Sequence, residues 1–164
     1  MKKALLVIDV QKDFKDANGI YEKTVRYINE NKDQYFQIVA TLFKNHEKSM
    51  FVKHLDWKDC FEFKSDKDNL YETHFLCLKD TYGLPRLKET LSPNGDFLEQ
   101  FKLYDCVEII GCELDACIMA VCFQLWDAGI DFKVLTDYCW TNNEEVEQDT
   151  IIQLLKRQFG DCIC

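Results

Sequence analysis

The stretch ALLVID, residues 4–9, is an unbroken apolar run that ends at an acidic residue. A strand that helices cover on both faces has this composition, because neither face meets water. Such strands belong to parallel sheets, and polar side chains that follow them lie at the carboxyl edge of the sheet. Residues 4–9 therefore predict an α/β fold with Asp9 at the end of its first strand.

The rest of the chain alternates strand and helix patterns in the same way. Apolar runs typical of strands lie near residues 36–43, 74–78, 106–110 and 131–136, and stretches typical of helices lie near residues 21–33, 95–103, 115–126 and 143–159. This alternation is typical of right-handed βαβ crossovers. We expect a three-layer αβα sandwich with a mostly parallel sheet of about six strands, in which the first and fourth strands are neighbours and residues 161–164 form the last.

Two stretches carry additional expectations. Residues 45–69 are rich in aromatic and charged residues and predict a long loop with a short helix. The final helix is expected to begin at Asn143 as its N-cap and to stop at Gly160, with acidic residues in its first turn and basic residues in its last.

Composition limits the class of protein. The chain has 164 residues, 47% of them hydrophobic and 30% charged, which fits one globular domain over residues 1–164. The net charge of −9 argues against a nucleic-acid partner, and no apolar run is long enough to span a membrane. The nine cysteines are odd in number and follow no signal peptide, so we expect reduced thiols in the cytoplasm.

Three polar residues follow strand patterns and are the candidates for chemistry. Asp9 ends the first strand, Lys79 ends the third, and Cys117 lies in the first turn of the helix after the fourth. Taken singly, each has a structural explanation: a strand end, a solvated lysine and a core cysteine. Together they offer a carboxylate base, a cation and a thiol whose pKa a helix N-terminus is expected to lower.

Three segments carry a resemblance to a known family. Residues 4–14, ALLVIDVQKDF, and residues 110–118, IGCELDACI, resemble the opening strand and the nucleophile segment of isochorismatase-like cysteine hydrolases. Residues 79–82, KDTY, are similar to the family's lysine with a tyrosine three positions on. The resemblance covers nearly the whole chain, and the order and spacing of the segments are more specific than any one of them.

The resemblance implies a Rossmann-like fold and a catalytic triad of Asp9, Lys79 and Cys117. In that mechanism Asp9 accepts the thiol proton, Lys79 steadies the charges, and Cys117 attacks a small amide or a related C–N bond to give a covalent intermediate. It also implies a cis peptide at Cys112-Glu113 that aims the Glu113 and Cys117 amides at the oxyanion. No cofactor is implied, and relatives commonly form dimers or larger homo-oligomers.

The chain also departs from the family pattern. Leu114 stands where a hydroxyl residue is usual, and the residues after Lys79 lack the usual continuation. Nicotinamidases of this superfamily bind a metal through an Asp-x-His pair and another histidine, whereas this chain has Asp56-Trp57-Lys58. An ammonium offers no lone pair to a metal, so we expect no metal site.

Three functions stay open at this stage. The leading interpretation is a cysteine hydrolase of small amides. The second is a catalytically altered binding or regulatory module, which Leu114 and the segment after Lys79 keep open. The third is a nicotinamidase-type amidase that needs a metal.

Other aromatic and imidazole side chains have no fixed role. Trp57, Phe61 and Phe63 form either an aromatic lid over the pocket or a hydrophobic cluster under a long loop. The three histidines do not share the spacing of metal ligands: His46, His54 and His74.

Overall fold

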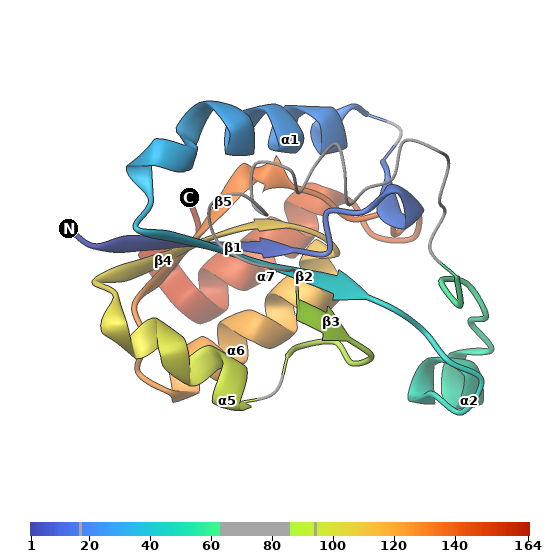
Figure 1. Ribbon diagram of the computed structural model, residues 1–164. Coiled ribbons are helices and arrows are strands. Elements are labelled where there is room, and N and C mark those ends of the chain that lie inside the picture. Colours follow the sequence, from blue (N-terminus) through green and yellow to red (C-terminus); the bar gives the residue numbers. More distant parts are fainter. Residues whose placement is uncertain (17, 63–85, 94) are drawn as a thin grey trace.

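The computed structural model describes residues 1–16, 18–62, 86–93 and 95–164. Within them, five strands form one sheet in the order β3-β2-β1-β4-β5, and every pairing is parallel (Figure 1). The strands are β1 (Lys3–Ile8), β2 (Gln37–Phe43), β3 (Arg86–Lys88), β4 (Cys106–Gly111) and β5 (Phe132–Cys139). The fold class is confirmed. The first strand and the strand at residues 106–110 are neighbours in the sheet, as expected.

The first strand lies at the centre of the sheet and is buried on both faces. Its residues alternate between two hydrophobic clusters, with Leu6 and Ile8 in one and Leu5 and Val7 in the other. This explains why residues 4–8 are continuously apolar, since a strand with helices on both sides has no face toward water.

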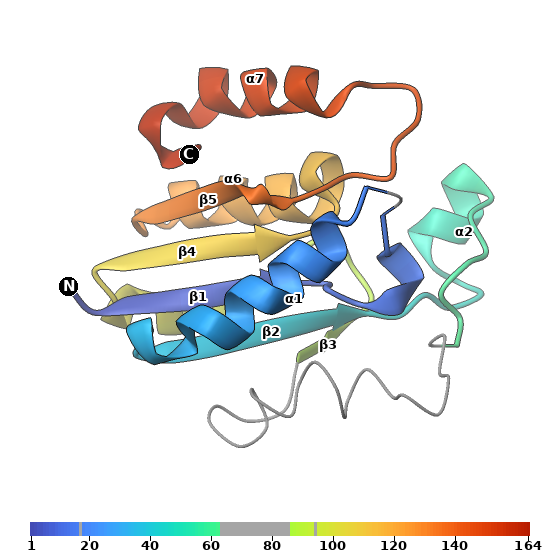
Figure 2. The ribbon, with the colours of Figure 1, turned by 90° about the horizontal axis from the view of Figure 1, so that it is seen from above.

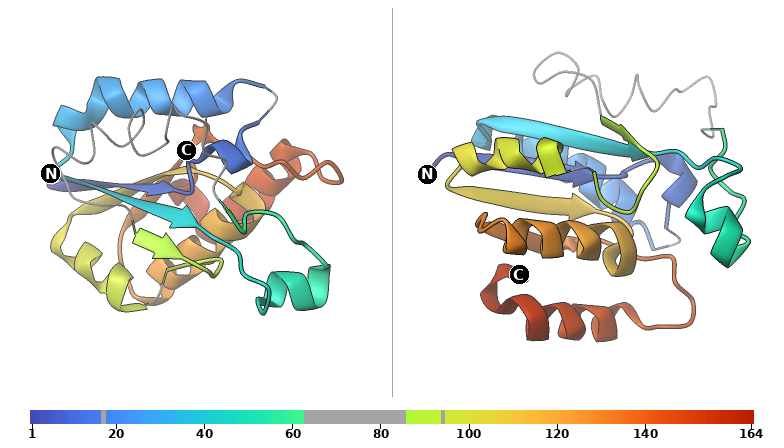
Figure 3. Two further views of the ribbon diagram at one scale, coloured as in Figure 1. Left: turned by 45° about the vertical axis from the view of Figure 1, so that its right-hand side comes forward. Right: turned by 90° about the horizontal axis from the view of Figure 1, so that it is seen from below.

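Helices cover both faces of the sheet (Figures 2 and 3). The α-helices are α1 (Ile20–Asn31), α2 (Met50–Leu55), α5 (Gly95–Glu99), α6 (Met119–Asp127) and α7 (Gln148–Phe159). Short 3-10 turns lie at Lys12–Phe14, Lys32–Gln34, Gln100–Leu103 and Gly160–Cys162, and a π-helical turn at Leu114–Ile118 leads into α6. Buried residues of α1 belong to one cluster and those of α5, α6 and α7 to the other, which makes the three layers.

Helix α1 begins with a side-chain cap from outside the helix. The Asp16 carboxylate accepts hydrogen bonds from the backbone amides of Asn18, Ile20 and Tyr21, at 2.7 to 3.1 Å. Desolvation by itself raises the pKa of this buried carboxyl, but the amide hydrogen bonds lower it more, so the net pKa lies below its usual range. The helix keeps Tyr21 and Ile28 buried against the sheet.

The structure differs from the sequence predictions at several elements. The sheet has five strands in the described residues, and residues 161–164 contribute one bridge, between Ile163 and Val134. The strand expected at residues 74–78 lies outside the described residues. In α6, Phe123 and Trp126 are about half exposed, although residues 116–126 are almost entirely apolar in sequence.

The final helix also differs, because it begins at Gln148 and not at Asn143. The Asn143 side chain donates to the Asp115 carboxylate and accepts from the Glu145 amide, which holds it in the loop before α7. The predicted end at Gly160 is confirmed.

A buried asparagine organises the loop that follows β2. Asn45 donates from its side-chain amide to the carbonyl oxygens of Trp57 and Asp59 and accepts from the Ser49 hydroxyl. Ser49 in turn caps α2 through the Val52 amide. The expected short helix in this loop is thus present, beyond the carboxyl end of β2 (Figure 1).

In the described part of the chain, no helix is long and apolar enough to cross a membrane.

Candidate active site

Asp9 leaves the sheet at the carboxyl end of β1 and is completely buried. Its backbone is in the left-handed region, with φ of 48°, which is uncommon outside glycine and frequent at functional sites. The Thr41 hydroxyl donates to Asp9 Oδ1 at 2.8 Å, and Thr41 also accepts from the Asp9 amide. The end of β2 therefore fixes one oxygen of this carboxylate.

The neighbouring strand β4 ends in a close backbone approach. Gly111 has φ of +121°, and a Cβ atom there would lie 2.0 Å from the Ile8 carbonyl oxygen, so only glycine fits. The next residue, Cys112, donates its amide to the same Ile8 oxygen. The peptide bond between Cys112 and Glu113 is cis, as the resemblance implies. These contacts bring the segment after β4 against the end of β1.

Cys117 lies in the π-helical turn that opens α6. The turn is closed by the Ile118 amide, which donates to the Glu113 carbonyl oxygen. π-Helical turns are rare and often occur at functional sites. The Cys117 side chain is buried, with 7% of its surface exposed.

Lys88, the last residue of β3, joins these two residues. Its Nζ lies 2.6 Å from Asp9 Oδ2, in an ion pair of two buried side chains. The same ammonium donates to Cys117 Sγ at 3.3 Å and to the Thr90 carbonyl oxygen at 2.9 Å. All three ammonium donors therefore have partners. Asp9 Oδ2 thus has the Lys88 ammonium as its partner, and the Asp9 carboxylate also interacts with the Cys117 thiol.

The structure thus brings together two of the three predicted triad residues. Asp9 and Cys117 converge at the carboxyl edge of the sheet, whereas Lys79 lies outside the described residues. The lysine that contacts both is Lys88, which the sequence analysis missed because it placed the third strand at residues 74–78. The one available signal is that Lys88, like Asp9, ends a strand and precedes a turn.

Burial dominates the electrostatics of the thiol. Desolvation and the adjacent Asp9 carboxylate raise the pKa of Cys117 to about 12, although the Lys88 ammonium opposes this. The expectation of a pKa lowered by the helix N-terminus is therefore wrong, and the resting group is a thiol. Burial by itself lowers the pKa of Lys88, but Asp9 and Cys117 raise it more, so this lysine remains an ammonium.

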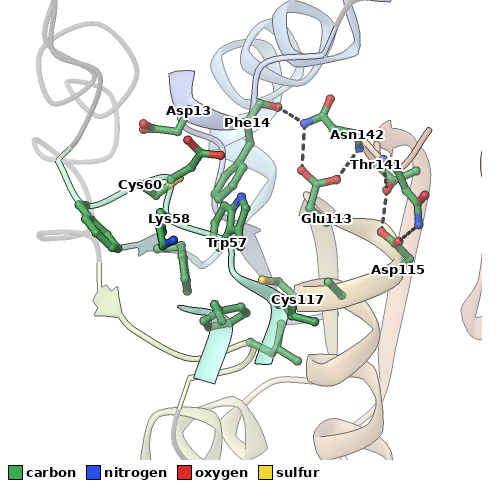
Figure 4. Close-up of a pocket in the computed structure, with 18 of the residues that line it drawn as sticks. Asp13, Phe14, Trp57, Lys58, Cys60, Glu113, Asp115, Cys117, Thr141 and Asn142 are labelled. Atoms are coloured by element: carbon green, nitrogen blue, oxygen red, sulfur yellow. Dashed lines mark hydrogen bonds between the residues drawn. The ribbon is translucent and has the colours of Figure 1, made fainter. Parts of the chain in front are cut away.

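The thiol faces a cavity of about 750 Å³. Figure 4 shows Cys117 at its floor, with Trp57 and Phe14 on one side and Glu113 and Asp115 on the other. The cavity is thus bounded by the turn after β1, the loop after β2, the start of the α6 region and the loop after β5. A small organic molecule fits within this volume.

Four aromatic rings form one wall of this cavity, and we call them the aromatic wall: Phe14, Phe43, Phe51 and Trp57. Phe14 stacks on Trp57 with ring centroids 6.4 Å apart, and the Phe43 ring contacts both Phe51 and Trp57. Of the aromatic residues that the sequence suggested as a lid, Trp57 and Phe61 line the cavity, and Phe63 lies outside the described residues.

Glu113 and Asp115 form the opposite side, and neutral groups hold both in place. The Asn142 backbone and side-chain amides donate to the two Glu113 carboxylate oxygens, and the Asn142 side chain also donates to the Phe14 carbonyl oxygen. The Thr141 hydroxyl donates to Asp115 at 2.6 Å. The loop after β5 thus fixes the segment that carries Cys117.

The Asp56-Trp57-Lys58 segment contains an ion pair between two largely exposed side chains. The Lys58 ammonium lies 2.5 Å from the Asp56 carboxylate. Among the described residues, no group of three or more His, Cys, Asp or Glu side chains has the arrangement of a metal site.

No protein-family model and no curated protein matches the sequence. Solved structures do match in fold. A pyrazinamidase/nicotinamidase from Streptococcus mutans UA159 has a TM-score of 0.77 at 17% identity, over 99% of this chain and 100% of that one.

Two other solved structures match over nearly the same range. An N-carbamoylsarcosine amidase from Thermoplasma acidophilum has a TM-score of 0.68 at 16% identity, over 99% of this chain and 95% of that one. An isochorismatase-like hydrolase from Alkaliphilus metalliredigens has a TM-score of 0.65 at 14% identity, over 96% and 92%. The chain has the fold of these proteins.

Proposed function

We propose that this chain is a cysteine hydrolase of the isochorismatase-like family that cleaves a small amide or a related C–N bond. The observation that carries the proposal is the Lys88 ammonium, which contacts both Asp9 and Cys117 below the cavity that Cys117 lines. A thiol, a carboxylate and an ammonium that share contacts can transfer a proton and form a covalent bond in one place. The nicotinamidases and the amidase of the same fold cleave amides, which favours this bond class.

In the first half of the reaction, the thiol attacks the amide carbon. Asp9 accepts the Cys117 proton while the sulfur bonds to the carbonyl carbon, whose oxygen becomes an oxyanion. The backbone amides of Glu113 and Cys117 are our candidates to stabilise that oxyanion. The protonated Asp9 then gives its proton to the leaving nitrogen, the C–N bond breaks, and an amine departs from a thioester.

In the second half, water replaces the thiol. Asp9 takes a proton from the water as its oxygen attacks the thioester carbon, and collapse of the tetrahedral intermediate breaks the C–S bond. The sulfur recovers the proton from Asp9, and a carboxylic acid leaves. Atoms balance as one amide and one water giving one amine and one acid.

Lys88 offsets the charge that develops at the sulfur. Asp9 alone would oppose a thiolate, because two negative charges would share a buried site. The ammonium contacts both groups and remains between them as the proton moves. We therefore assign to Lys88 the role that the resemblance gave to Lys79.

The proposed reaction needs no metal and no cofactor. The Asp56 carboxylate is engaged by Lys58, whose ammonium cannot ligate a metal at neutral pH. Activity is expected to survive treatment with EDTA, and its loss in EDTA with recovery on zinc would contradict this part of the proposal.

We also propose a cytoplasmic location and a homo-oligomeric state. The eight cysteines within the described residues are free thiols, which fits a reducing compartment. Light scattering on the purified protein checks the second expectation.

Intact-mass analysis with a panel of small amides tests the function. Wild type is expected to show a covalent acyl adduct and release of the amine, and Cys117→Ala is expected to show neither. Cys122→Ala is the matched control, because it removes a buried thiol of the same helix that lies in the core. Turnover by Cys117→Ala equal to that of wild type would overturn the proposal.

A further inference from the structure

The cavity lining is rich in carboxylates. Five lining residues are acidic, and Lys58 is the only lysine or arginine in the lining that the structure describes. The acidic residues are Asp13, Asp59, Glu62, Glu113 and Asp115. Lys58 is paired with Asp56, and Lys88 below the floor is paired with Asp9. Glu62 lies 3.9 Å from Lys44, and the lining residues still carry more negative than positive charge.

Two of these carboxylates lie on the same segment as the nucleophile. Glu113 and Asp115 precede Cys117 by four and two residues and lie on one side of the cavity lining (Figure 4). Their hydrogen-bond partners are amides and a hydroxyl, and neither has an ion pair in the described residues. Neutral donors fix the position of a carboxylate without cancelling its charge.

The aromatic wall has the complementary property. A cation is attracted to the face of an aromatic ring, most strongly to tryptophan. The Lys88 ammonium already lies 5.0 Å from the centre of the Phe43 ring. Trp57 lines the cavity as part of the aromatic wall and stacks on Phe14. A cationic group in the cavity would have rings on one side and carboxylates on the other.

We propose that the substrate is a small amide that carries a cationic group, an ammonium or a guanidinium. This rests on the proposed hydrolase: the amide carbon lies at Cys117, and the cation lies between the aromatic wall and the carboxylates of Glu113 and Asp115. Substrates with a carboxylate are disfavoured, because the Glu113 and Asp115 carboxylates would repel them. The cavity and its thiol define where the amide binds, and the carboxylates of the lining favour substrates that carry a cation.

Charged thiol reagents test this without knowledge of the substrate. Three methanethiosulfonates differ mainly in charge: the trimethylammonium-ethyl, hydroxyethyl and sulfonatoethyl compounds. In each case a bond forms between Cys117 Sγ and the reagent sulfur, methanesulfinate leaves with the electron pair, and the thiol proton passes to Asp9. Peptide mapping by mass spectrometry gives the rate at Cys117 apart from the other thiols, and each rate is divided by that of N-acetylcysteine amide.

In wild type, the cationic reagent is expected to react about tenfold faster than the anionic one after this correction. The ratio should fall severalfold in Glu113→Gln and in Asp115→Asn, and also when salt is raised from about 0.05 to 0.5 M. The control is Asp127→Asn, an exposed residue at the far end of α6 and about 15 Å along the helix axis from Cys117. It removes the same charge and should leave the ratio unchanged.

Two other results would overturn the inference in distinguishable ways. If Cys117 reacts with the neutral reagent but the corrected rates of the charged pair are equal or reversed, the cationic substrate is wrong and the hydrolase stands. If Cys117 reacts with none of the three reagents while the unfolded chain reacts fully, the thiol is closed to the cavity, and the hydrolase and the inference fail together.

Discussion

A lysine-carboxylate pair lies at each end of the parallel strands, which we call the amino edge and the carboxyl edge. The two pairs differ in the other groups that contact them. At the amino edge, Lys3 lies 2.7 Å from Glu108 Oε1, and the Tyr35 hydroxyl donates to Glu108 Oε2. At the carboxyl edge, Lys88 lies 2.6 Å from Asp9 Oδ2, and the Thr41 hydroxyl donates to Asp9 Oδ1. Both pairs are largely buried, but the second also contacts a thiol below a cavity.

The comparison teaches that burial and charge pairing do not by themselves mark an active site. Glu108 has a donor for each oxygen, and its hydroxyl partner Tyr35 is itself bonded to Tyr27. A closed network of this kind stabilises a fold and has no atom free to accept a proton. Asp9 differs because it interacts with a thiol, a group that has a proton to give.

The largest expected effect is on activity at the carboxyl edge. Cys117→Ala should lower turnover of a responsive amide by about 10⁴-fold or more, because no other group replaces the covalent step. Circular dichroism should show a folded protein, since the substitution removes one small side chain. A residual rate within tenfold of wild type would show that the thiol is not the nucleophile.

The two carboxylates give the next contrast. Asp9→Asn should lower kcat by about 10²- to 10⁴-fold, since an amide cannot accept the thiol proton. Glu108→Gln, the matched change at the amino edge, should leave kcat within about twofold. Steady-state kinetics on both variants make the comparison, and equal losses would mean that Asp9 acts through stability and not through proton transfer.

The sequence predicted those residues of the site that follow long apolar runs. Asp9 ends the run of β1, and Cys117 follows the run of β4, so topology alone places them at one edge. Lys88 was not predicted as a site residue, because β3 has only three residues. Arg86 and Leu87 are exposed, so such a strand has no apolar pattern.

Other features depend on burial, which a sequence does not report. The thiol pKa was predicted in the wrong direction, because the depth of Cys117 and its contact with Asp9 outweigh the helix N-terminus. The start of α7 was misplaced because the side chain of Asn143 is held by Asp115, a residue distant in sequence. Long-range contacts of this kind override a local capping pattern.

The two lysines are expected to differ in their effect on stability. Lys88→Met leaves the Asp9 carboxylate buried without a counter-charge, and should lower the free energy of unfolding by about 3 to 5 kcal/mol. Lys3 is 27% exposed, so water replaces part of its interaction, and Lys3→Met should cost about 1 kcal/mol or less. Urea unfolding followed by tryptophan fluorescence measures both, and equal costs would contradict the difference in burial.

Alkaline pH should lower the stability of the whole fold. Burial raises the pKa of Cys112 and Cys117, as it does for Cys122 and Cys139 in the core. Above about pH 9 the unfolded thiols lose protons while the native ones keep theirs, so stability is full below that pH and falls above it, by up to about 1.4 kcal/mol per pH unit for each thiol.

Urea unfolding at pH 8 and pH 10 checks this sign. The variant that combines Cys112→Ala with Cys117→Ala should lose less stability over this interval than wild type does. A steeper loss in that variant would mean that the two thiols do not titrate as their burial predicts.

The last contrast concerns the hydroxyl at the amino edge. Tyr35→Phe removes the donor to Glu108 Oε2 and the partner of the Tyr27 hydroxyl, while the ring keeps its packing. The cost should be about 1 to 2 kcal/mol of unfolding free energy, which is typical of a buried polar atom that loses its partner. The corrected rate of Cys117 with the neutral methanethiosulfonate should not change, because Glu108 lies in the first half of β4, whereas Cys117 follows the carboxyl end of that strand. A change in that rate would show that the two edges are coupled through the central strands, and that the amino-edge pair serves the site as well as the fold.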